Sequence, residues 1–410
     1  MPNPDFLKAR DANDVQEAVR WALGEAKALE VVGRGSKRLL GRPAQWDATL
    51  DLSALTGVTM YEPEELVLTA HAGTPIREIE TLVESRNQEL AFEPMDYGVL
   101  VGVPAGQGSI GGVLAANLSG PRRIKAGAAR DHFLGFTGVS GRGETFKSGG
   151  RVVKNVTGYD LCKLMAGSWG TLAAMTEVTI KVLPRAETEM TIVVQDMADA
   201  DAITAMAAAL GSSCDVSGAA HLPKRIAPQV MPGLGAGHAA TVFRLEGVEP
   251  SVVHRGRALS ELMKPYGVLA MIDPPRSRVL WRAIRDVTPF AASGPAGTYP
   301  VWRISTAPAN GAELARLIAE RIDAEFIYDW GGGLVWAVLA PSEDGGETIV
   351  RAAVEACGGH ATLVRAPAAI RAMVPVFGPE QGATAALTAR VKESFDPNGV
   401  LNPGRMWAGG

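Results

Sequence analysis

Residues 106–112 read Gly106-Gln107-Gly108-Ser109-Ile110-Gly111-Gly112, and a helical pattern of apolar residues begins near Val113. Glycine has no side chain, so the backbone of such a loop can approach a bound group closely. Exposed backbone N–H groups followed by the start of a helix suit a pyrophosphate. We therefore expect a phosphate-binding loop here, although an ordinary turn would explain this stretch alone equally well.

A second glycine-rich loop, Gly33–Gly41, lies in the same half of the chain and follows a predicted buried strand at residues 29–32. It carries three basic residues, Arg34, Lys37 and Arg38, among its backbone donors. Two such loops in one half of the chain favour a bound pyrophosphate over two unrelated turns.

A different interpretation comes from Gly106, Gly108 and Gly111, which match the G-x-G-x-x-G fingerprint of dinucleotide-binding Rossmann folds. Asp131 lies twenty residues after Gly111, where that fingerprint places an acidic residue. Pro104, however, stands where the preceding strand should end, and a basic segment follows Pro121. We therefore expect a different fold.

The composition limits the class of protein. The chain has 410 residues, of which 47% are hydrophobic and 20% charged, so it can bury a large core in two or three domains. A net charge of -4 and 6% aromatic residues argue against a dedicated nucleic-acid binder. The three cysteines are scattered and form no C-x-x-C motif, so neither a disulfide framework nor an iron–sulfur cluster held by this chain alone is expected.

The N-terminus lacks the apolar core of a signal peptide, and we expect a cytoplasmic protein. Residues 97–120 carry no charge, but their many glycines, with Pro104 and Asn117, do not suit a membrane-spanning helix. No transmembrane segment is therefore predicted.

The texture of the sequence predicts an α+β fold in three segments. Residues 1–186 mix strands, helices and glycine-rich turns. Residues 187–378 show an α+β pattern without dense glycine loops. Residues 379–410 begin with a helix at 381–395. Further predictions are a hairpin over 133–146 and strands that include 190–195, 241–245, 301–306, 326–330 and 334–339.

A third segment carries a family resemblance. It contains Lys154-Asn155-Val156-Thr157-Gly158-Tyr159-Asp160-Leu161, Gly167-Ser168-Trp169-Gly170-Thr171-Leu172 and Thr176-Glu177-Val178. With both glycine-rich loops, it resembles the FAD-binding region of the vanillyl-alcohol-oxidase/p-cresol-methylhydroxylase (PCMH-type) flavoproteins. The C-terminal run Phe395-Asp396-Pro397-Asn398-Gly399-Val400-Leu401-Asn402-Pro403-Gly404-Arg405 is similar to the 2-hydroxy-acid dehydrogenase branch. Within that branch, the chain looks like the FAD-binding E subunits of bacterial glycolate oxidase (glycolate dehydrogenase).

The resemblance implies non-covalent FAD in a PCMH-type domain at residues 1–186, with two lobes that meet near residue 55. It also implies that residues 187–378 form a cap built on an antiparallel sheet. It places Arg34, Gly35, Ser36 and Lys37 around the pyrophosphate. The flavin and diphosphate would be lined by Ser109, Ile110, Gly111, Gly112, Ala116 and Asn117. Thr157, Gly158 and Tyr159 would lie beside the isoalloxazine, and Glu177 and Val178 beside the adenine and ribose. Asn402 and Arg405 would return to the flavin from the C-terminus.

The sequence also departs from its relatives. Loop Gly33–Gly41 contains neither His nor Cys, so the covalent histidyl linkage of some relatives is excluded. Cys162 is better explained as a small core thiol than as a flavin thioether. None of the six histidines stands at metal-ligand spacing, so no metal site is expected.

The resemblance implies oxidation of glycolate, a 2-hydroxy acid, to glyoxylate by hydride transfer to flavin N5, with electrons passed on through an iron–sulfur partner. The implied partners are that iron–sulfur subunit and a sister flavin subunit that keeps the metal, with peripheral association at the inner membrane through them. This chain is then either catalytic itself or a flavin-carrying relay or scaffold. The alternative is a stand-alone FAD-dependent 2-hydroxy-acid or alcohol dehydrogenase or oxidase.

No catalytic residue can be named from the sequence. His221, His238 and His360 are candidates for a base in the cap, and Arg303 and Lys224 for binding a carboxylate. Each histidine is better explained as a surface or core residue, and each of the two cations as a solvated charge. An apolar run at Val335, Trp336 and Val338 fits a subunit interface or an internal strand equally well.

Overall fold

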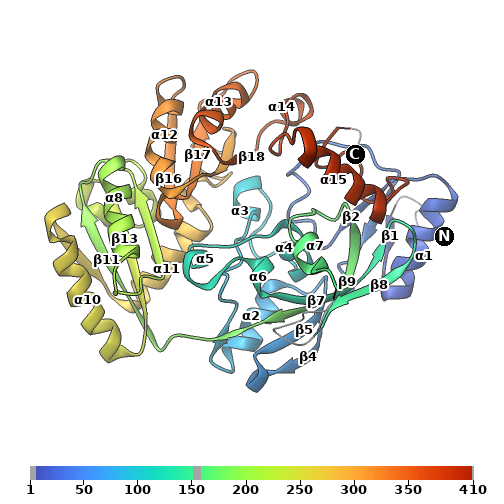
Figure 1. Ribbon diagram of the computed structural model, residues 1–410, viewed down its shortest axis with the longest axis horizontal. Coiled ribbons are helices and arrows are strands. Elements are labelled where there is room, and N and C mark those ends of the chain that lie inside the picture. Colours follow the sequence, from blue (N-terminus) through green and yellow to red (C-terminus); the bar gives the residue numbers. More distant parts are fainter. Residues whose placement is uncertain (1–5, 151–157, 409–410) are drawn as a thin grey trace.

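The N-terminal part of the chain forms two small sheets that lie side by side in the computed structural model, which describes residues 6–150 and 158–408 (Figure 1). The first sheet is parallel, in the order β1-β3-β2, and the second is antiparallel, in the order β4-β5-β9-β7-β8. The strands of these sheets are β1 (Phe6–Lys8), β2 (Leu29–Val32), β3 (Ala48–Asp51), β4 (Val58–Glu62), β5 (Val67–His71), β7 (Phe133–Ser140), β8 (Thr145–Gly149) and β9 (Ala173–Lys181).

Helices connect and cover these sheets, and a short pair of strands, β6 (Gln88–Glu89) and β10 (Leu183–Pro184), leads out toward the cap. The helices are α1 (Ala12–Gly24), α2 (Ile76–Glu84), α3 (Gly98–Val101), α4 (Ile110–Ala116), α5 (Arg123–Ala126), α6 (Ala129–His132) and α7 (Leu161–Met165). Helix α1 follows the rule for amphipathic helices, since Val15, Ala18, Val19 and Ala22 are buried and recur at helical spacing.

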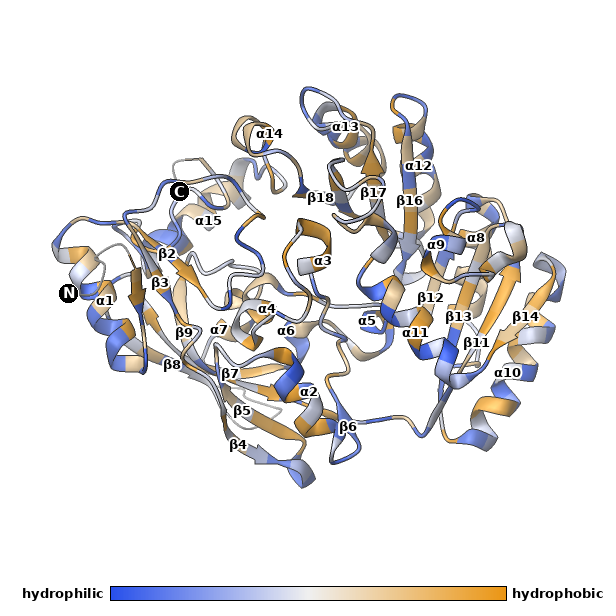
Figure 2. Cartoon of the chain, turned by 180° about the vertical axis from the view of Figure 1, so that it is seen from behind, coloured by the Kyte–Doolittle hydropathy of each residue, from blue (hydrophilic) through white to orange (hydrophobic). Residues whose placement is uncertain are grey.

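The cap is one antiparallel sheet in the order β14-β11-β13-β12-β16-β17-β15-β18. Its strands are β11 (Thr188–Gln195), β12 (Gly218–Leu222), β13 (Ala240–Gly247), β14 (Leu269–Ile272), β15 (Val301–Ser305), β16 (Ala324–Asp329), β17 (Leu334–Leu339) and β18 (His360–Arg365). Its helices are α8 (Asp199–Leu210), α9 (Ala227–Val230), α10 (Glu249–Met263), α11 (Pro274–Arg285), α12 (Gly311–Ala319) and α13 (Glu347–Cys357). In Figure 2 the strands at the centre of this sheet are largely apolar, whereas the outer helix α10 is mixed.

Two helices follow the cap, α14 (Ala368–Met373) and α15 (Gly382–Phe395), and bring the chain back over the N-terminal part (Figure 1). Beyond them, Leu401 forms a bridge to Leu29 of β2. The C-terminal residues therefore lie beside the loop that leaves β2. Over the described residues, no helix has the length and apolar character needed to cross a membrane.

Several predictions of secondary structure are confirmed. Strands β7 and β8 form the hairpin expected at 133–146, and β17 has the bounds expected from its apolar run. Val335, Trp336 and Val338 are all buried, so this run is an internal strand of the monomer. The Rossmann interpretation is wrong, because the residues before the Gly106 loop form the short helix α3 instead of a strand.

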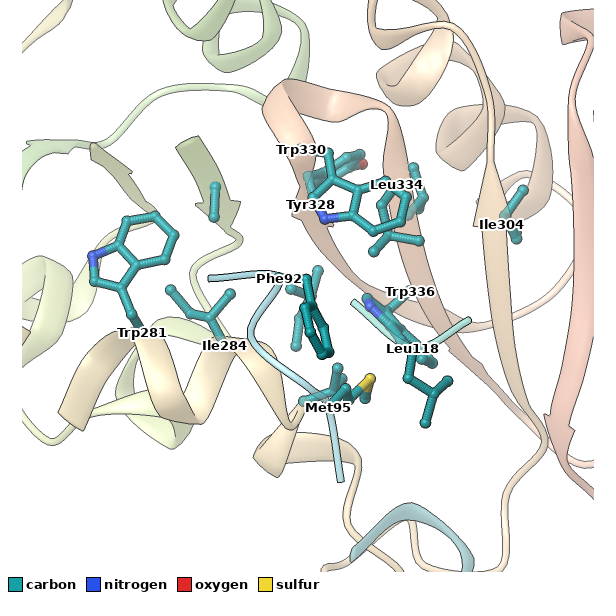
Figure 3. Packing of buried hydrophobic residues seen from close by; sticks show 14 of the residues in the cluster. Phe92, Met95, Leu118, Trp281, Ile284, Ile304, Tyr328, Trp330, Leu334 and Trp336 are labelled. Carbon is teal, nitrogen blue, oxygen red and sulfur yellow. The ribbon is translucent and has the colours of Figure 1, made fainter. Parts of the chain in front are cut away.

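An apolar layer joins the cap to the N-terminal part. Phe92, Met95 and Leu118 lie against Trp330 and Trp336 of the cap, as the close-up shows (Figure 3). Because these side chains come from both parts and belong to one core cluster, the two parts share a hydrophobic core.

An ionic cluster lies beside this layer and consists of Glu93, Arg122, Arg244 and Glu246. Arg244 donates two hydrogen bonds to Glu93, of 2.8 and 3.0 Å, and Arg122 donates to Glu246 at 2.8 Å. The backbone N–H of Arg122 also donates to Glu93. Burial raises the pKa of the Glu93 carboxyl, but Arg122 and Arg244 outweigh it and lower the pKa to about 2. Every charge in this cluster thus has an opposite charge supplied by the protein.

Candidate cofactor site

A cleft opens in the N-terminal part where the loops after β2 and before α4 meet. It encloses about 690 Å³ of space free of atoms, part of it open to solvent. The lining residues come from six segments: Val31, Val32, Gly33, Arg34, Gly35, Ser36, Lys37, Arg38, Leu52, Ala72, Ser109, Gly111, Gly112, Ala115, Ala116, Trp169, Gly170, Ala173, Met175 and Arg405.

A buried carboxylate on β2 anchors the loop that follows this strand. Glu30 on β2 is 1% exposed, and it accepts hydrogen bonds from Arg38 at 2.9 Å and from Thr49 on β3 at 3.1 Å. Gly35 has φ +75°, a left-handed conformation that favours glycine. This anchoring leaves the segment Arg34–Lys37 along the wall of the cleft.

The two glycine-rich loops touch each other. A Cβ atom added to Gly33 would lie 2.5 Å from Ser109 Oγ, so only glycine fits there without a shift of Ser109. Ser109 is the N-cap of α4, and its Oγ accepts a hydrogen bond from Gly112 N. A Cβ at Gly111 would lie 2.7 Å from the Cβ of Ala72. Gly33 therefore makes room for the Ser109 side chain, and Gly111 lets the start of α4 approach the backbone of Ala72.

Two cations point into the cleft without an acidic partner among the described residues. Burial and the nearby Arg405 lower the pKa of Lys37 to about 8, although Asp96 acts in the opposite direction. Burial lowers the pKa of Arg405 to about 10. Arg405 donates one hydrogen bond to the carbonyl of Lys37, but its buried Nε has no partner. Cations that are desolvated and unpaired in this way fit a bound anion.

The C-terminal run shapes one wall of the cleft. The Oδ1 atom of Asn402 accepts from Val31 N at 2.9 Å, and its Nδ2 donates to the carbonyls of Trp169 and Gly170. Asp396 fixes the preceding turn by accepting from the N–H groups of Val400 and Leu401. Asn402 therefore joins β2 to the 169–170 loop and positions these two walls of the cleft without lining it. Arg405 itself lines the cleft.

The structure brings together most of the residues expected from the sequence. Nine of them line the cleft: Arg34, Gly35, Ser36, Lys37, Ser109, Gly111, Gly112, Ala116 and Arg405. Ile110 is the first residue of α4, and its side chain is buried. Asn117 ends that helix at φ +51°, and its Oδ1 accepts a hydrogen bond from Arg130 N.

The remaining candidates lie elsewhere in the described residues. Glu177 on β9 accepts a hydrogen bond from Thr59, and Val178 is buried in the core. Gly158 is exposed and the Tyr159 side chain is 92% exposed, so neither lines the cleft. Thr157, with the Lys154-Asn155-Val156 motif, lies outside the described residues.

Sequence reasoning missed several lining residues. Val31 and Val32 could have been found from their position just before the first loop. Leu52, Ala72, Ala173 and Met175 come from strands or strand ends far apart in the sequence, and only the folded sheets bring them to the cleft. Trp169 belongs to the motif at residues 167–172 but was not predicted to line the cleft. Its indole lines the cleft and packs against Phe377 with 5.4 Å between ring centroids.

The other candidate groups have ordinary surroundings. Cys162 is buried, and burial raises the pKa of its thiol to about 12, as expected of a core thiol. His221 is buried and hydrogen-bonded to Thr241 and Asp199, while His238 lies at the surface beside Asp196. Residues 6–150 and 158–408 contain no group of three His, Cys, Asp or Glu side chains placed to hold a metal ion.

Comparison with known proteins agrees with this cleft. Residues 5–149 match the model of the FAD-binding domain family, which covers both glycine-rich loops. The chain is 33% identical to glycolate oxidase subunit GlcE of Escherichia coli over 399 residues, which is 96% of each protein. The chain belongs to the GlcE family. It is an FAD-linked oxidoreductase, and FAD is its cofactor.

Another relative of this GlcE-family chain matches a smaller share of its length. Glycolate oxidase subunit GlcD of Bacillus subtilis is 30% identical over 167 residues, 40% of this chain and 34% of that protein. Among solved structures, p-cresol methylhydroxylase with bound substrate has a TM-score of 0.68 at 14% identity and covers 98% of this chain and 88% of its own. Alkyldihydroxyacetonephosphate synthase has a TM-score of 0.67 at 15% identity, covering 97% of this chain and 75% of its own. The PCMH-type fold is thereby confirmed.

Proposed function

We propose that this chain is the FAD-carrying E subunit of a glycolate oxidase complex that converts glycolate to glyoxylate. The observation that supports it most directly is the unpaired cation pair, Lys37 and Arg405, in a cleft whose two glycine loops permit close backbone approach. A bound diphosphate would supply the negative charge that balances these two cations. Near-complete alignment with GlcE supports the choice of complex.

In this proposal the residues along the loop after β2, Arg34, Gly35, Ser36 and Lys37, hold the diphosphate together with Arg405. Ser109, Ile110, Gly111, Gly112, Ala116 and Asn117 form or support the wall along the flavin. Thr157, Gly158, Tyr159, Glu177 and Val178 stay proposed contacts by resemblance, and Asn402 is proposed to position the cleft walls. The FAD-binding unit is proposed as residues 1–186, the cap as 187–378, and the returning segment as 379–410.

FAD, when bound, supplies the hydride acceptor, and the protein supplies binding, orientation and electrostatics. The chain's share of this work is to keep two cations desolvated beside the diphosphate and to close the cleft with Trp169. The wall residues Leu52, Ala72, Ala173 and Met175 exclude water from the ring system by their apolar side chains.

The partners belong to the proposal as well. We propose a sister flavin subunit that keeps a metal site and an iron–sulfur subunit that receives the electrons. Attachment at the inner membrane would run through these partners. Two proteins with glycolate oxidase subunit names, GlcE and GlcD, match this chain, which supports a complex of several subunits.

The test is to purify the chain, record its visible spectrum, and add glycolate and D-lactate without oxygen. A flavin spectrum that stays oxidised alone and bleaches after the sister subunits are added supports a flavin-carrying relay. Bleaching of the isolated chain would instead show a working oxidation site in this subunit. A folded chain that takes up no FAD, even at high concentration, would overturn the proposal.

A further inference from the structure

A polar patch interrupts the apolar face of the cap sheet next to its edge strand. Arg303 pairs with Thr362, and Ser305 pairs with His360, across strands β15 and β18. Residues paired across strands, and residues two apart along a strand, point to the same face of a sheet. These four side chains therefore form a block on one face, while Ile304 and Ala361 between them are buried.

This face looks toward the N-terminal part of the protein. Arg303 also pairs with Trp336 on β17, and the indole of Trp336 packs edge-on against Tyr97, with 6.2 Å between ring centroids. Tyr97 directly precedes α3, which contacts β18. Trp336 lies within the apolar layer between the two parts (Figure 3). The polar block thus faces the junction of the two parts, where Arg303, Ser305 and Thr362 are half-buried and His360 is exposed.

A fifth side chain, Arg123 of α5, joins the block from the N-terminal part. Its guanidinium carbon lies 4.2 Å from the centroid of the Trp330 ring, and that of Arg303 lies 5.1 Å from the same centroid. Trp330 adopts φ +53°, a strained conformation for so bulky a residue, and its Nε1 donates to the carbonyl of Gly120 at 3.0 Å. The Trp330 ring therefore lies between the two parts, and the guanidinium groups of Arg123 and Arg303 both lie close to it.

Neither of these arginines has a counterion among the described residues. Arg122, next to Arg123, forms ion pairs with Glu89, Glu93 and Glu246. Arg123 and Arg303 form none, and no side-chain hydrogen bond within the described residues involves them, Ser305, His360 or Thr362. Burial, and then Arg303, lower the pKa of Arg123.

The acidic groups that face the two arginines are already engaged. Asp131 pairs with Lys163 at 2.9 Å, and Asp329 accepts a hydrogen bond from Trp330 N at 2.7 Å. Burial raises the pKa of Asp329 to about 7, so this carboxyl group is a poor counterion at neutral pH. The block is rich in hydrogen-bond donors and positive charge, and short of acceptors.

A chain of contacts links the block to the cofactor cleft. Trp169 lines the cleft and packs against Phe377. Gly378 follows, and a Cβ atom placed on it would lie 3.9 Å from the Cβ of His360. The cap side of the cleft and the polar block are therefore separated by one short segment of chain.

From this arrangement we propose that Arg123, Arg303, Ser305, His360 and Thr362 form a binding site for a small organic carboxylate at the junction of the two parts. An ionised carboxylate has only acceptors, and it suits guanidinium and hydroxyl donors. That the acid is a 2-hydroxy acid such as glycolate rests on the proposed function, whereas the anion site itself does not.

The test measures glycolate binding to the FAD-loaded chain by saturation-transfer NMR on the glycolate methylene group, without turnover. Sodium chloride at equal ionic strength is the reference. We expect saturable binding that Arg303→Gln weakens about tenfold or more, because a charge-assisted contact is lost. The matched control is Arg316→Gln on α12, whose exposed guanidinium pairs with Glu313 and Glu320 and should leave binding unchanged.

Two further variants keep the test decisive if Arg303→Gln fails to fold. Thr362→Val and Ser305→Ala keep the strands and should each weaken binding about fivefold. Glycolate that does not bind saturably to the wild-type chain, or binds all variants alike, would overturn the inference. FAD affinity is measured on the same samples by flavin fluorescence. FAD binding without glycolate binding would remove the anion site and leave the proposed function standing.

Discussion

The ionic cluster and the cofactor cleft both hold desolvated positive charge, but they balance it differently. In the ionic cluster, Arg122 and Arg244 face Glu93 and Glu246 within hydrogen-bond distance. In the cleft, Lys37 and Arg405 face no such carboxylate among the described residues. Removing the partner of a buried charge that is paired within the protein destabilises the fold. We expect a buried charge without such a partner to pair with a ligand. The two regions therefore predict opposite responses to mutation.

The largest effect is expected in the ionic cluster. Glu93→Ala removes the carboxylate that accepts two hydrogen bonds from the buried Arg244 and leaves Glu246 to face both Arg244 and Arg122. The free energy of unfolding should fall by about 3–5 kcal/mol. Urea denaturation of the apo chain measures this change. Glu313→Gln, which removes an exposed partner of Arg316, is the control and should change stability by less than about 1 kcal/mol. Equal losses in the two variants would contradict the contrast between matched and exposed pairs.

Arg405→Met tests the other side of the comparison. The variant removes an uncompensated buried charge, so apo stability should stay level or rise, while FAD affinity should fall about 10- to 100-fold. Titration of flavin fluorescence gives the affinity. Arg42→Met is the control, since the exposed Arg42 donates only to a carbonyl outside the cleft. An apo protein that is destabilised with unchanged FAD affinity would assign Arg405 to the fold.

Lys37 should give the cleft a pH dependence. Its pKa of about 8 in the empty cleft means that it loses its proton as the pH rises through 8. Bound diphosphate would favour the charged lysine, so binding takes up a proton at higher pH. FAD affinity should then fall by up to about tenfold per pH unit between pH 8 and 9, and Lys37→Met should remove this slope. A wild-type affinity that is flat from pH 7 to 9 would show that Lys37 does not contact the anion.

Of the two regions, the sequence predicted the glycine-rich loops of the cleft and missed the ionic cluster. Loop positions such as Lys37 and Ser109 could be found because glycine-rich spacing is local. The regular strand β17 was equally accessible from its apolar run. Arg122 and Arg123 look alike in the sequence, and only the fold shows that one meets three glutamates and the other none. Such differences depend on strands brought together from distant segments, which periodicity does not encode.

The smallest expected effect comes from the contact between the two loops. Gly33→Ala would push Ser109 Oγ away and weaken the cap of α4, at a cost of about 1 kcal/mol. FAD affinity should fall as well, because the loops move apart. Gly24→Ala at the end of α1 has no atom within 4 Å of the new Cβ and should be neutral or slightly stabilising. Thermal denaturation with and without FAD separates the two variants, and equal shifts would show that the loops do not support each other.

The hydrogen bonds of Asn402 have a consequence for the order of events while the ribosome synthesises the chain. Its hydrogen bonds join β2 to the 169–170 loop, and Arg405 supplies a cation of the cleft. The ribosome makes β2 long before it makes these residues. If Arg405 binds the diphosphate as proposed, a nascent chain can form strands β1 to β9 before it can retain the cofactor, and FAD retention would report that translation has passed Arg405. Chains terminated before Arg405 would then leave the ribosome without a competent flavin site.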